Sequence, residues 1–402
     1  MCRGRRQLNL AQKYGDTMAS QILRGTDGRV GFVELFFDLV FVFAITQISH
    51  NLLSHYTAQG LVETAIMFQA IWMVWIYTTW VLNLLDPNAV AVRALLFAMM
   101  LGGVFVSMAV PQAFGARGWV FALAYVGMQL GRTVFFLVMI WDNPATRLAY
   151  GRILIWFGLS AIFWIAGGFA PVESRTWLWL IAIGIEFSSG LVGFFVPRLG
   201  RAVSTDWNVL GGHMAERCGL FVIICLGESL LVSGGTFAKM VWTPGGIAAF
   251  LAAVAGAIGM WWVYFHIGYT RAVDLIERSG NPGRLARVAY SYCHIPIVAG
   301  IVVSAVGSER AIAHPGDAGV LVEAASVIGG VALFLIGNGL FKWATSARFF
   351  PLSHIAGLVL CILVTFVGPY TSLLVLNAAA AVILGIVAVW EHLSYDPDSV
   401  VP

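Results

Sequence analysis

Long runs of apolar side chains, separated by short polar stretches, recur along almost the whole chain from residue 33 onward. Each run holds about 17 to 25 residues, which in a helix is enough to cross roughly 30 Å of hydrocarbon. The pattern predicts twelve transmembrane helices, at 33–53, 61–84, 92–111, 119–141, 152–170, 176–196, 213–235, 245–268, 289–308, 318–341, 352–368 and 371–391. We therefore expect an all-α polytopic membrane protein.

The composition excludes a soluble globular protein. Of 402 residues, 59% are hydrophobic and only 11% charged, against roughly a quarter charged in an ordinary soluble domain. The formal net charge of +3 lacks the electrostatic footprint of a nucleic-acid partner. The five cysteines show no metal-type spacing and no disulfide framework, so we expect neither a metal site nor a cofactor.

The distribution of basic residues predicts how the chain crosses the membrane. Residues 1–30 form a basic tail without the apolar run that a cleavable signal peptide needs. With this tail in the cytoplasm, 17 of the 23 Lys and Arg residues lie on the cytoplasmic side, four lie outside and two lie within helices. The positive-inside rule thus favours twelve spans with both termini in the cytoplasm.

The two halves of the chain resemble each other. Glu34 and Glu216 each begin a similar apolar run, at a shift of 182 residues. The aromatic clusters at 72–77 and 261–266 align at a shift of 189. Two parallel repeats would explain both alignments, and such halves commonly enclose a site between them. Chance similarity between apolar helices is the alternative.

The two predicted repeats and the segments that flank them divide the chain into four parts. A basic N-terminal tail at 1–30 precedes a first six-helix half at 31–197. The second six-helix half at 198–392 is followed by a short C-terminal tail at 393–402.

Ionisable side chains within the first span are candidate functional residues, because each costs about 2.5 to 3.5 kcal/mol to insert and usually faces the bundle interior. Glu34 and Asp38 lie on one polar stripe of this helix, with Thr46 somewhat further round. Two carboxylates one turn apart repel, so either one holds a proton or an arginine of another helix neutralises them. Alternatively, Glu34 complements the helix dipole at the helix start.

The seventh span places His213, Arg217 and Glu228 on one face. Arg217 and Glu228 stand roughly 16 Å apart along the axis, so each needs a partner elsewhere. Arg132 and Glu186, in the fourth and sixth spans, are natural counter-ions for charges on the first and seventh spans. A structural salt bridge is the alternative for both.

The motifs of soluble enzymes and pumps are missing. The sequence contains no Walker-type phosphate loop, no His-Glu-x-x-His and no Gly-x-Ser-x-Gly. No connection is long enough for a folded catalytic domain. ATP-driven transport is therefore disfavoured, and we do not expect an enzyme. His266, toward the cytoplasmic end of the eighth span, is either an interface residue or a proton relay.

The segment ELFFDLVFVFAITQISH, which starts at Glu34, resembles the signature of the bacterial low temperature requirement A (LtrA) family. HMAERCGLFVIICLGESLL, which starts at His213, and WWVYF at 261–265 are also similar to this family. The resemblance implies a multi-spanning bacterial membrane protein, and it points to Glu34, Asp38, Glu216, Arg217, Gly227 and Glu228. We expect the protein in the inner membrane. Where the family pattern has an acid after the aromatic cluster, this chain has His266.

The favoured function is a proton-coupled secondary transporter of an unidentified small solute. Glu228, Asp38 and Glu34 are the candidate proton carriers, with Arg132 or Arg217 as counter-ion or contact for an anionic substrate. The expected partners are membrane lipid and a small solute or ion. The oligomeric state stays open, with a homodimer as one option.

Two other functions remain open. FFDLVFVFAIT, which starts at Phe36, is similar to the first helix of a potassium-channel family of lysosomes and bacteria, although Phe37 replaces the serine of its Phe-Ser-Asp signature. A cation channel built from six-helix units would line its pore with Asp38 and Thr46. A membrane-embedded lipid-modifying enzyme, with the carboxylates as general acid and base, is the third option.

Overall fold

The computed structural model describes residues 22–25, 28–202, 209–266, 279, 282–319, 321–346 and 349–394. This part of the chain holds twelve long helices and no β-strand, only isolated β-bridges. The prediction of an all-α protein with about twelve helices is confirmed. The predicted tails at 1–30 and 393–402 fall largely outside the described residues.

The chain divides into two compact units, made of residues 1–44 with 62–214 and of residues 45–61 with 215–402. The first unit is built mainly from the beginning of α2 (Phe32–Ser54), then α3 (Ala58–Leu82), α4 (Val90–Ala109), the 3-10 turn η1 (Val110–Gln112), α5 (Gly118–Met139), α6 (Pro144–Phe169) and α7 (Val172–Leu191). The second is built mainly from α8 (Gly211–Lys239), α9 (Pro244–Phe265), α11 (Pro282–Ala286), the π-helical turn η3 (Arg287–Tyr292), α12 (His294–Ala313), α13 (Leu321–Ser346), α14 (Leu352–Val367), the 3-10 turn η4 (Gly368–Tyr370) and α15 (Leu373–Leu393). The predicted internal repeat and its boundaries stay predictions.

Eleven helical stretches of the described residues are long and apolar enough to cross a membrane. The remaining long helix is α7, which carries three charged side chains, Glu173, Arg175 and Glu186. Large apolar side chains also point outward, as on α2, where Phe36 and Leu39 are 57% and 59% exposed. Such exposure suits contact with lipid chains, which solvate an apolar surface as well as a protein core does.

Local sequence signals determine where several helices begin. The side chains of Asn143, Thr243 and Ser372 accept hydrogen bonds from backbone N–H groups in the first turns of α6, α9 and α15. Pro144 and Pro244 follow the first two of these caps, where a missing N–H costs nothing. The caps therefore define the helix starts that the apolar runs alone leave open.

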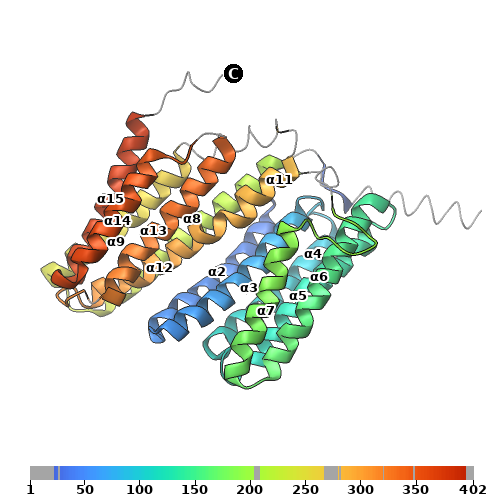
Figure 1. The fold of residues 1–402 in the computed structure, drawn as a ribbon, viewed down its shortest axis with the longest axis horizontal. Coiled ribbons are helices and arrows are strands. Elements are labelled where there is room, and N and C mark those ends of the chain that lie inside the picture. The colour runs from blue at the N-terminus through green and yellow to red at the C-terminus, as the bar shows by residue number, and fades with distance from the viewer. Residues whose placement is uncertain are drawn as a thin grey trace, which may run out of the picture. The chain divides into compact units, whose positions relative to one another are not determined.

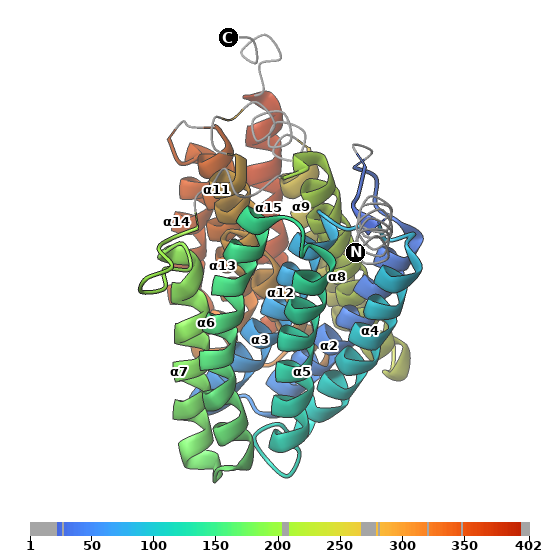
Figure 2. The same ribbon diagram turned by 90° about the vertical axis from the view of Figure 1, so that its right-hand side faces the viewer.

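Within each unit, neighbouring helices pack side by side. Figure 2 shows α5, α6 and α7 of the first unit in this arrangement. In the second unit, α12 lies against α13 (Figure 1). A Cβ atom at Gly300 would lie 2.4 Å from the backbone nitrogen of Phe334, and one at Gly330 would lie 2.4 Å from that of Ser304. Only glycine allows this close approach, which fixes the position of Ser304 on α12.

Candidate functional site

Glu34 lies in the first turn of α2, where it is fully buried and contacts nitrogen atoms of Arg24, Gly31 and His213. Its Oε2 accepts hydrogen bonds from Arg24 Nη2 at 2.8 Å and from the backbone N–H of Gly31 at 2.7 Å. Its Oε1 lies 2.8 Å from His213 Nε2. The positive partner is thus an arginine that precedes α2, where the sequence led us to expect an arginine of another helix.

The partners of Glu34 are fixed in turn. Arg24 donates from Nε to the carbonyl of Leu82 at 2.9 Å. Asn83 Nδ2 lies 3.2 Å from His213 Nδ1, so Nδ1 accepts the amide hydrogen and Nε2 carries the hydrogen that points to Glu34. The backbone N–H of Leu210 donates to Asn83 Oδ1 at 3.0 Å. This arrangement ties the start of α2 to the end of α3 and the beginning of α8.

Asp38, one turn further along α2, is also fully buried. The indole Nε1 of Trp75 on α3 donates a hydrogen bond to its Oδ1 at 2.7 Å. Trp75 is fully buried and lies against Trp72, with ring centroids 5.1 Å apart. A residue of the aromatic cluster at 72–77 therefore binds a candidate carboxylate.

The structure brings two of the predicted site residues, Thr46 and Glu228, into direct contact. The Thr46 hydroxyl donates to Glu228 Oε1 at 2.6 Å, and both side chains are half-buried. Among the described residues, no Lys, Arg or His nitrogen lies within 4.0 Å of the Glu228 carboxylate. Its environment therefore differs from that of Glu34, although both are acids within membrane spans.

Three further candidates lie apart from this pair. Arg217 is fully buried on α8, and Glu216 beside it is half-buried. Eleven residues separate Arg217 from Glu228, about 16 Å along the helix, so they do not pair. His266 follows α9 and is exposed, with its Nε2 3.0 Å from His392 Nδ1.

Arg132 on α5 belongs to a buried polar network of the first unit. Its Nη2 donates to Gln129 Oε1 at 2.7 Å, and its Nη1 lies 3.2 Å from the carbonyl of Val74 and 3.3 Å from the hydroxyl of Thr78. The guanidinium also lies over the ring of Tyr77, 5.7 Å from its centroid. Within the first unit Arg132 thus binds neutral polar groups and an aromatic ring, and its expected role as counter-ion for an acid of the first or seventh span stays a prediction.

Glu186 on α7 ends the same network. Tyr125 donates its hydroxyl hydrogen to Glu186 Oε2 at 2.5 Å and accepts one from Gln129 Nε2 at 3.0 Å. Ser160 and Trp164 of α6 donate to Oε1 at 2.7 and 3.0 Å. Glu186 thus binds hydroxyl and indole groups of its own unit, and its expected role as a counter-ion for the first and seventh spans stays a prediction.

A second buried ion pair escaped the sequence analysis. Lys342 lies within α13, where it donates to both carboxylate oxygens of Glu391 on α15 at 2.7 Å and to the carbonyl of Val263 at 2.9 Å. His354 Nδ1 lies 3.4 Å from the same carboxylate. Lys342 directly follows the predicted span at 318–341, and its side chain is about nine-tenths buried.

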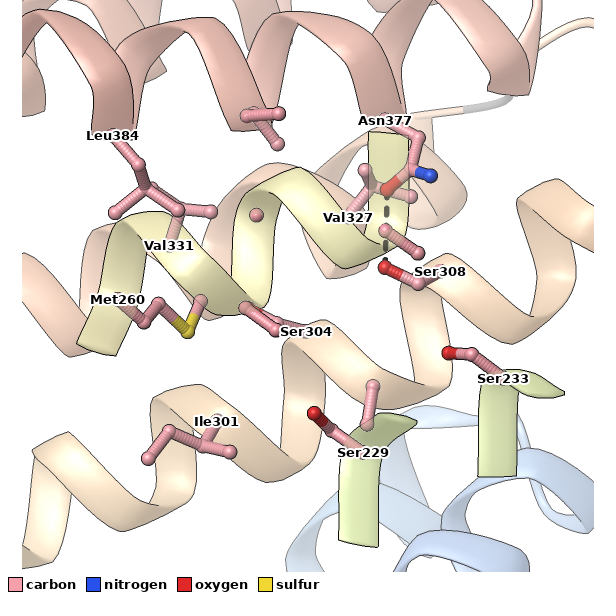
Figure 3. A pocket seen from close by; sticks show the side chains of 16 residues that line it. Ser229, Ser233, Met260, Ile301, Ser304, Ser308, Val327, Val331, Asn377 and Leu384 are labelled. Atoms are coloured by element: carbon pink, nitrogen blue, oxygen red, sulfur yellow. Dashed lines mark hydrogen bonds between the residues drawn. The ribbon is translucent and has the colours of Figure 1, made fainter. Parts of the chain in front are cut away.

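A cavity lined by hydroxyl groups lies inside the second unit. Ser229 and Ser233 of α8, Ser304 and Ser308 of α12 and Asn377 of α15 are its polar lining residues (Figure 3). Ser308 donates a hydrogen bond to Asn377 Oδ1 at 3.0 Å, drawn as the dashed line in Figure 3. Ser229, at one side of the cavity, directly follows Glu228 in the chain.

Sequence reasoning missed these serines, although a signal was present. Ser229 and Ser233 are four residues apart, as are Ser304 and Ser308, so each pair occupies one helix face. A pair of hydroxyls at this spacing in an apolar helix indicates a polar stripe that faces protein. Among the described residues, no group of three or more His, Cys, Asp or Glu side chains is arranged to hold a metal ion.

Comparison with known proteins gives the family. The model of the family described as bacterial low temperature requirement A protein (LtrA) matches residues 29–389. An uncharacterized protein of Rhizobium meliloti is 38% identical over 367 residues, which is 91% of this chain and 90% of that protein. No solved structure matches. Since the family model covers nearly the whole chain and the relative is similar over nearly its full length, the chain belongs to the bacterial low temperature requirement A (LtrA) family.

Proposed function

We propose that this LtrA family protein is a proton-coupled secondary transporter of a small solute, in which Glu228 carries the proton. The observation that supports the proposal best is the hydrogen bond between Thr46 and Glu228. A carboxyl group within a membrane span is a functional candidate because it is costly to keep there. Its partner here is a neutral hydroxyl.

A hydroxyl partner suits a group that gains and loses a proton. The Thr46 hydroxyl can donate to the Glu228 carboxylate, and it can accept from the protonated carboxylic acid. Both states therefore keep a hydrogen bond. In contrast, protonating Glu34 would weaken its contacts with Arg24 and His213, and breaking a buried ion pair costs about 3–5 kcal/mol. Glu228 is the better proton carrier, and Glu34 the better structural anchor.

The surroundings of Glu228 also favour transport. The serine-lined cavity begins one residue further along α8 and is built from five helices of the second unit. Polar groups converging within a membrane bundle are typical of substrate and ion pathways. We propose that the solute and the proton use this part of the second unit in the same transport cycle.

We also propose that the protein resides in the bacterial inner membrane with both termini in the cytoplasm. The support comes from the distribution of Lys and Arg, which follows the positive-inside rule.

The proposal is tested with purified protein in proteoliposomes that contain a pH-sensitive dye. Candidate solutes are added one at a time to the wild type, with and without an imposed pH gradient. We expect at least one solute to move protons and to accumulate against its own gradient, and a protonophore to abolish this accumulation. Passive cation flux without any added solute would instead support the channel. Vesicles that stay tight with every solute would remove the transporter proposal.

A further inference from the structure

The cavity of the second unit has a volume of about 30 Å³ and a mixed lining. Four serines and one asparagine supply its polar groups, and apolar residues that range from Ala257 to Met260 and Leu384 supply the rest. None of its lining residues is charged. The Oγ of Ser304 is buried and has no hydrogen-bond partner among the described residues. A buried hydroxyl of this kind is usually satisfied by a small polar ligand.

The size of the cavity restricts what it can hold. A single buried water needs about 10–15 Å³ measured in this way, together with two to four polar partners. The cavity therefore has room for about two water molecules. An amino acid or a sugar is too large for it in this conformation, and the charge that a metal ion would need among its ligands is missing from the lining.

Two carboxyl groups flank the cavity without lining it, and that of Glu228 points about 100° round α8 from the neighbouring serine. Glu228 directly precedes Ser229, the first lining serine. Beyond Ser233, Thr236 donates its hydroxyl hydrogen to Glu309 Oε1 of α12 at 2.9 Å. Eight residues separate Glu228 from Thr236, about 12 Å along the helix axis. Hydrogen-bonded oxygen atoms stand about 2.8 Å apart, so four or five links cover this length.

We propose that the cavity binds water and that this water, with the serine hydroxyls, conducts the proton between Glu309 and Glu228. The inference rests on the proposed function and specifies its proton pathway. Each hydroxyl or water along the path releases one proton as it receives one. The net result is that one carboxyl loses a proton and the other gains it, with no change in the groups between them.

The charges around Glu309 are compatible with this role. Arg310 forms an ion pair with Glu323, and its guanidinium lies 4.9 Å from the centroid of the Tyr56 ring. Among the described residues, no basic nitrogen lies within 4.0 Å of the Glu309 carboxylate. Glu309, like Glu228, has a threonine hydroxyl as its partner. Both ends of the path therefore carry an acid without an ion pair to break.

The first experiment tests for water in the cavity without any transport measurement. Hydroxyl radicals generated from water inside a protein oxidise a neighbouring methionine to its sulfoxide, which mass spectrometry detects. Met260 lines the cavity and is 3% exposed, whereas Met73 on α3 is 4% exposed and does not line it. We expect radiolysis of the wild type to oxidise Met260 well above Met73. Equal, background oxidation of both would show a dry cavity and overturn the inference.

The second experiment fills the cavity. Ala257→Val adds two methyl groups to its wall, and Ala255→Val makes the same change at an exposed position of the same helix. We expect Ala257→Val to lower Met260 oxidation to the Met73 level and to slow proton movement about tenfold, a step of one decade in rate. Ala255→Val should match the wild type in both measurements. Ser304→Ala, which removes a hydroxyl without breaking a hydrogen bond among the described residues, serves if the valine variant does not fold.

The outcomes separate the two proposals. If the wild type couples protons to solute and Ala257→Val or Ser304→Ala does so at the same rate, the pathway is wrong and the transporter stands. In the other case, Met260 is oxidised through internal water but the wild type moves no protons with any solute. The cavity then binds water, but both the proposed transport function and the proton-conducting role of the water are wrong.

Discussion

Thr46 donates a hydrogen bond to Glu228 across 2.6 Å, and the two residues stand 182 positions apart. This interval is the shift at which the apolar run beginning at Glu34 aligns with the run beginning at Glu216. The bond therefore joins corresponding positions of the two predicted repeats. In the predicted repeat, one copy supplies the carboxyl group at this position and the other supplies the hydroxyl.

The first prediction concerns this hydroxyl. Thr46→Val keeps the shape of the side chain but removes the donor to Glu228. A hydrogen bond to a charged group contributes about 1.5–3 kcal/mol, so we expect proton-driven uptake to slow about tenfold or more. Thr46→Ser keeps the hydroxyl and should stay near the wild-type rate. Equal rates for the valine and serine variants would show that the hydroxyl does not contribute.

The second prediction concerns stability. Arg24→Gln removes the cation that binds the buried Glu34 carboxylate. Leaving a buried charge without its cation costs about 3 kcal/mol, which should appear as a marked loss of thermal stability in detergent, followed by tryptophan fluorescence. Arg93→Gln makes the same change at an exposed position and should cost little. The account of Glu34 as an anchor fails if the two variants unfold at the same temperature.

A third prediction tests the network that ends at Glu186. Tyr125→Phe deletes the hydroxyl that links Gln129 to Glu186, and it leaves buried groups of both partners short of a bond. We expect a loss of about 1–3 kcal/mol in unfolding free energy. Tyr370→Phe, at a tyrosine that is 88% exposed, is the matched control. A Tyr125→Phe protein as stable as this control would mean that the network adds nothing to stability.

The fourth prediction concerns orientation in the membrane. With both termini in the cytoplasm, green fluorescent protein fused after Pro402 should fluoresce, and alkaline phosphatase at the same point should be inactive. Active phosphatase at the C-terminus would reverse the proposed orientation or change the number of spans by one.

The helices were predictable because lipid imposes a simple rule on the sequence. A span needs a long apolar run, and Leu, Val, Ala and Phe supply it in each described helix that is long and apolar enough to cross a membrane. The boundary at Gly368-Pro369 was also visible, because proline interrupts the helical hydrogen bonds between α14 and α15. α7 was found despite its charges, since its apolar residues still form one run.

The partners of the charged residues could not be predicted. The cost of burying a charge identified Glu34 and Arg132 as important, but it does not say what lies beside them. Arg24 binds Glu34 from a segment outside the predicted spans, and Arg132 binds an amide, a carbonyl and a hydroxyl. Such partners depend on how helices rotate and pack, which hydropathy does not encode.

The serine cavity was missed for a related reason. A serine costs little to insert into a membrane helix because it can bond to the carbonyl one turn earlier, as Ser229 does with Leu226 at 2.7 Å. No single serine therefore stands out in a hydropathy profile. Only the four-residue spacing within α8 and α12 marks the stripe, and the cavity needs both helices to be in place.

The central claim, that Glu228 carries the coupled proton, is tested most directly by Glu228→Gln in proteoliposomes loaded with a transported solute. Glu173→Gln, the same change at an exposed acid, is the control. The amide cannot take up or release a proton, so we predict that Glu228→Gln loses uptake driven by a pH gradient while retaining exchange of labelled for unlabelled solute. Accumulation by Glu228→Gln at the level of Glu173→Gln would contradict the account.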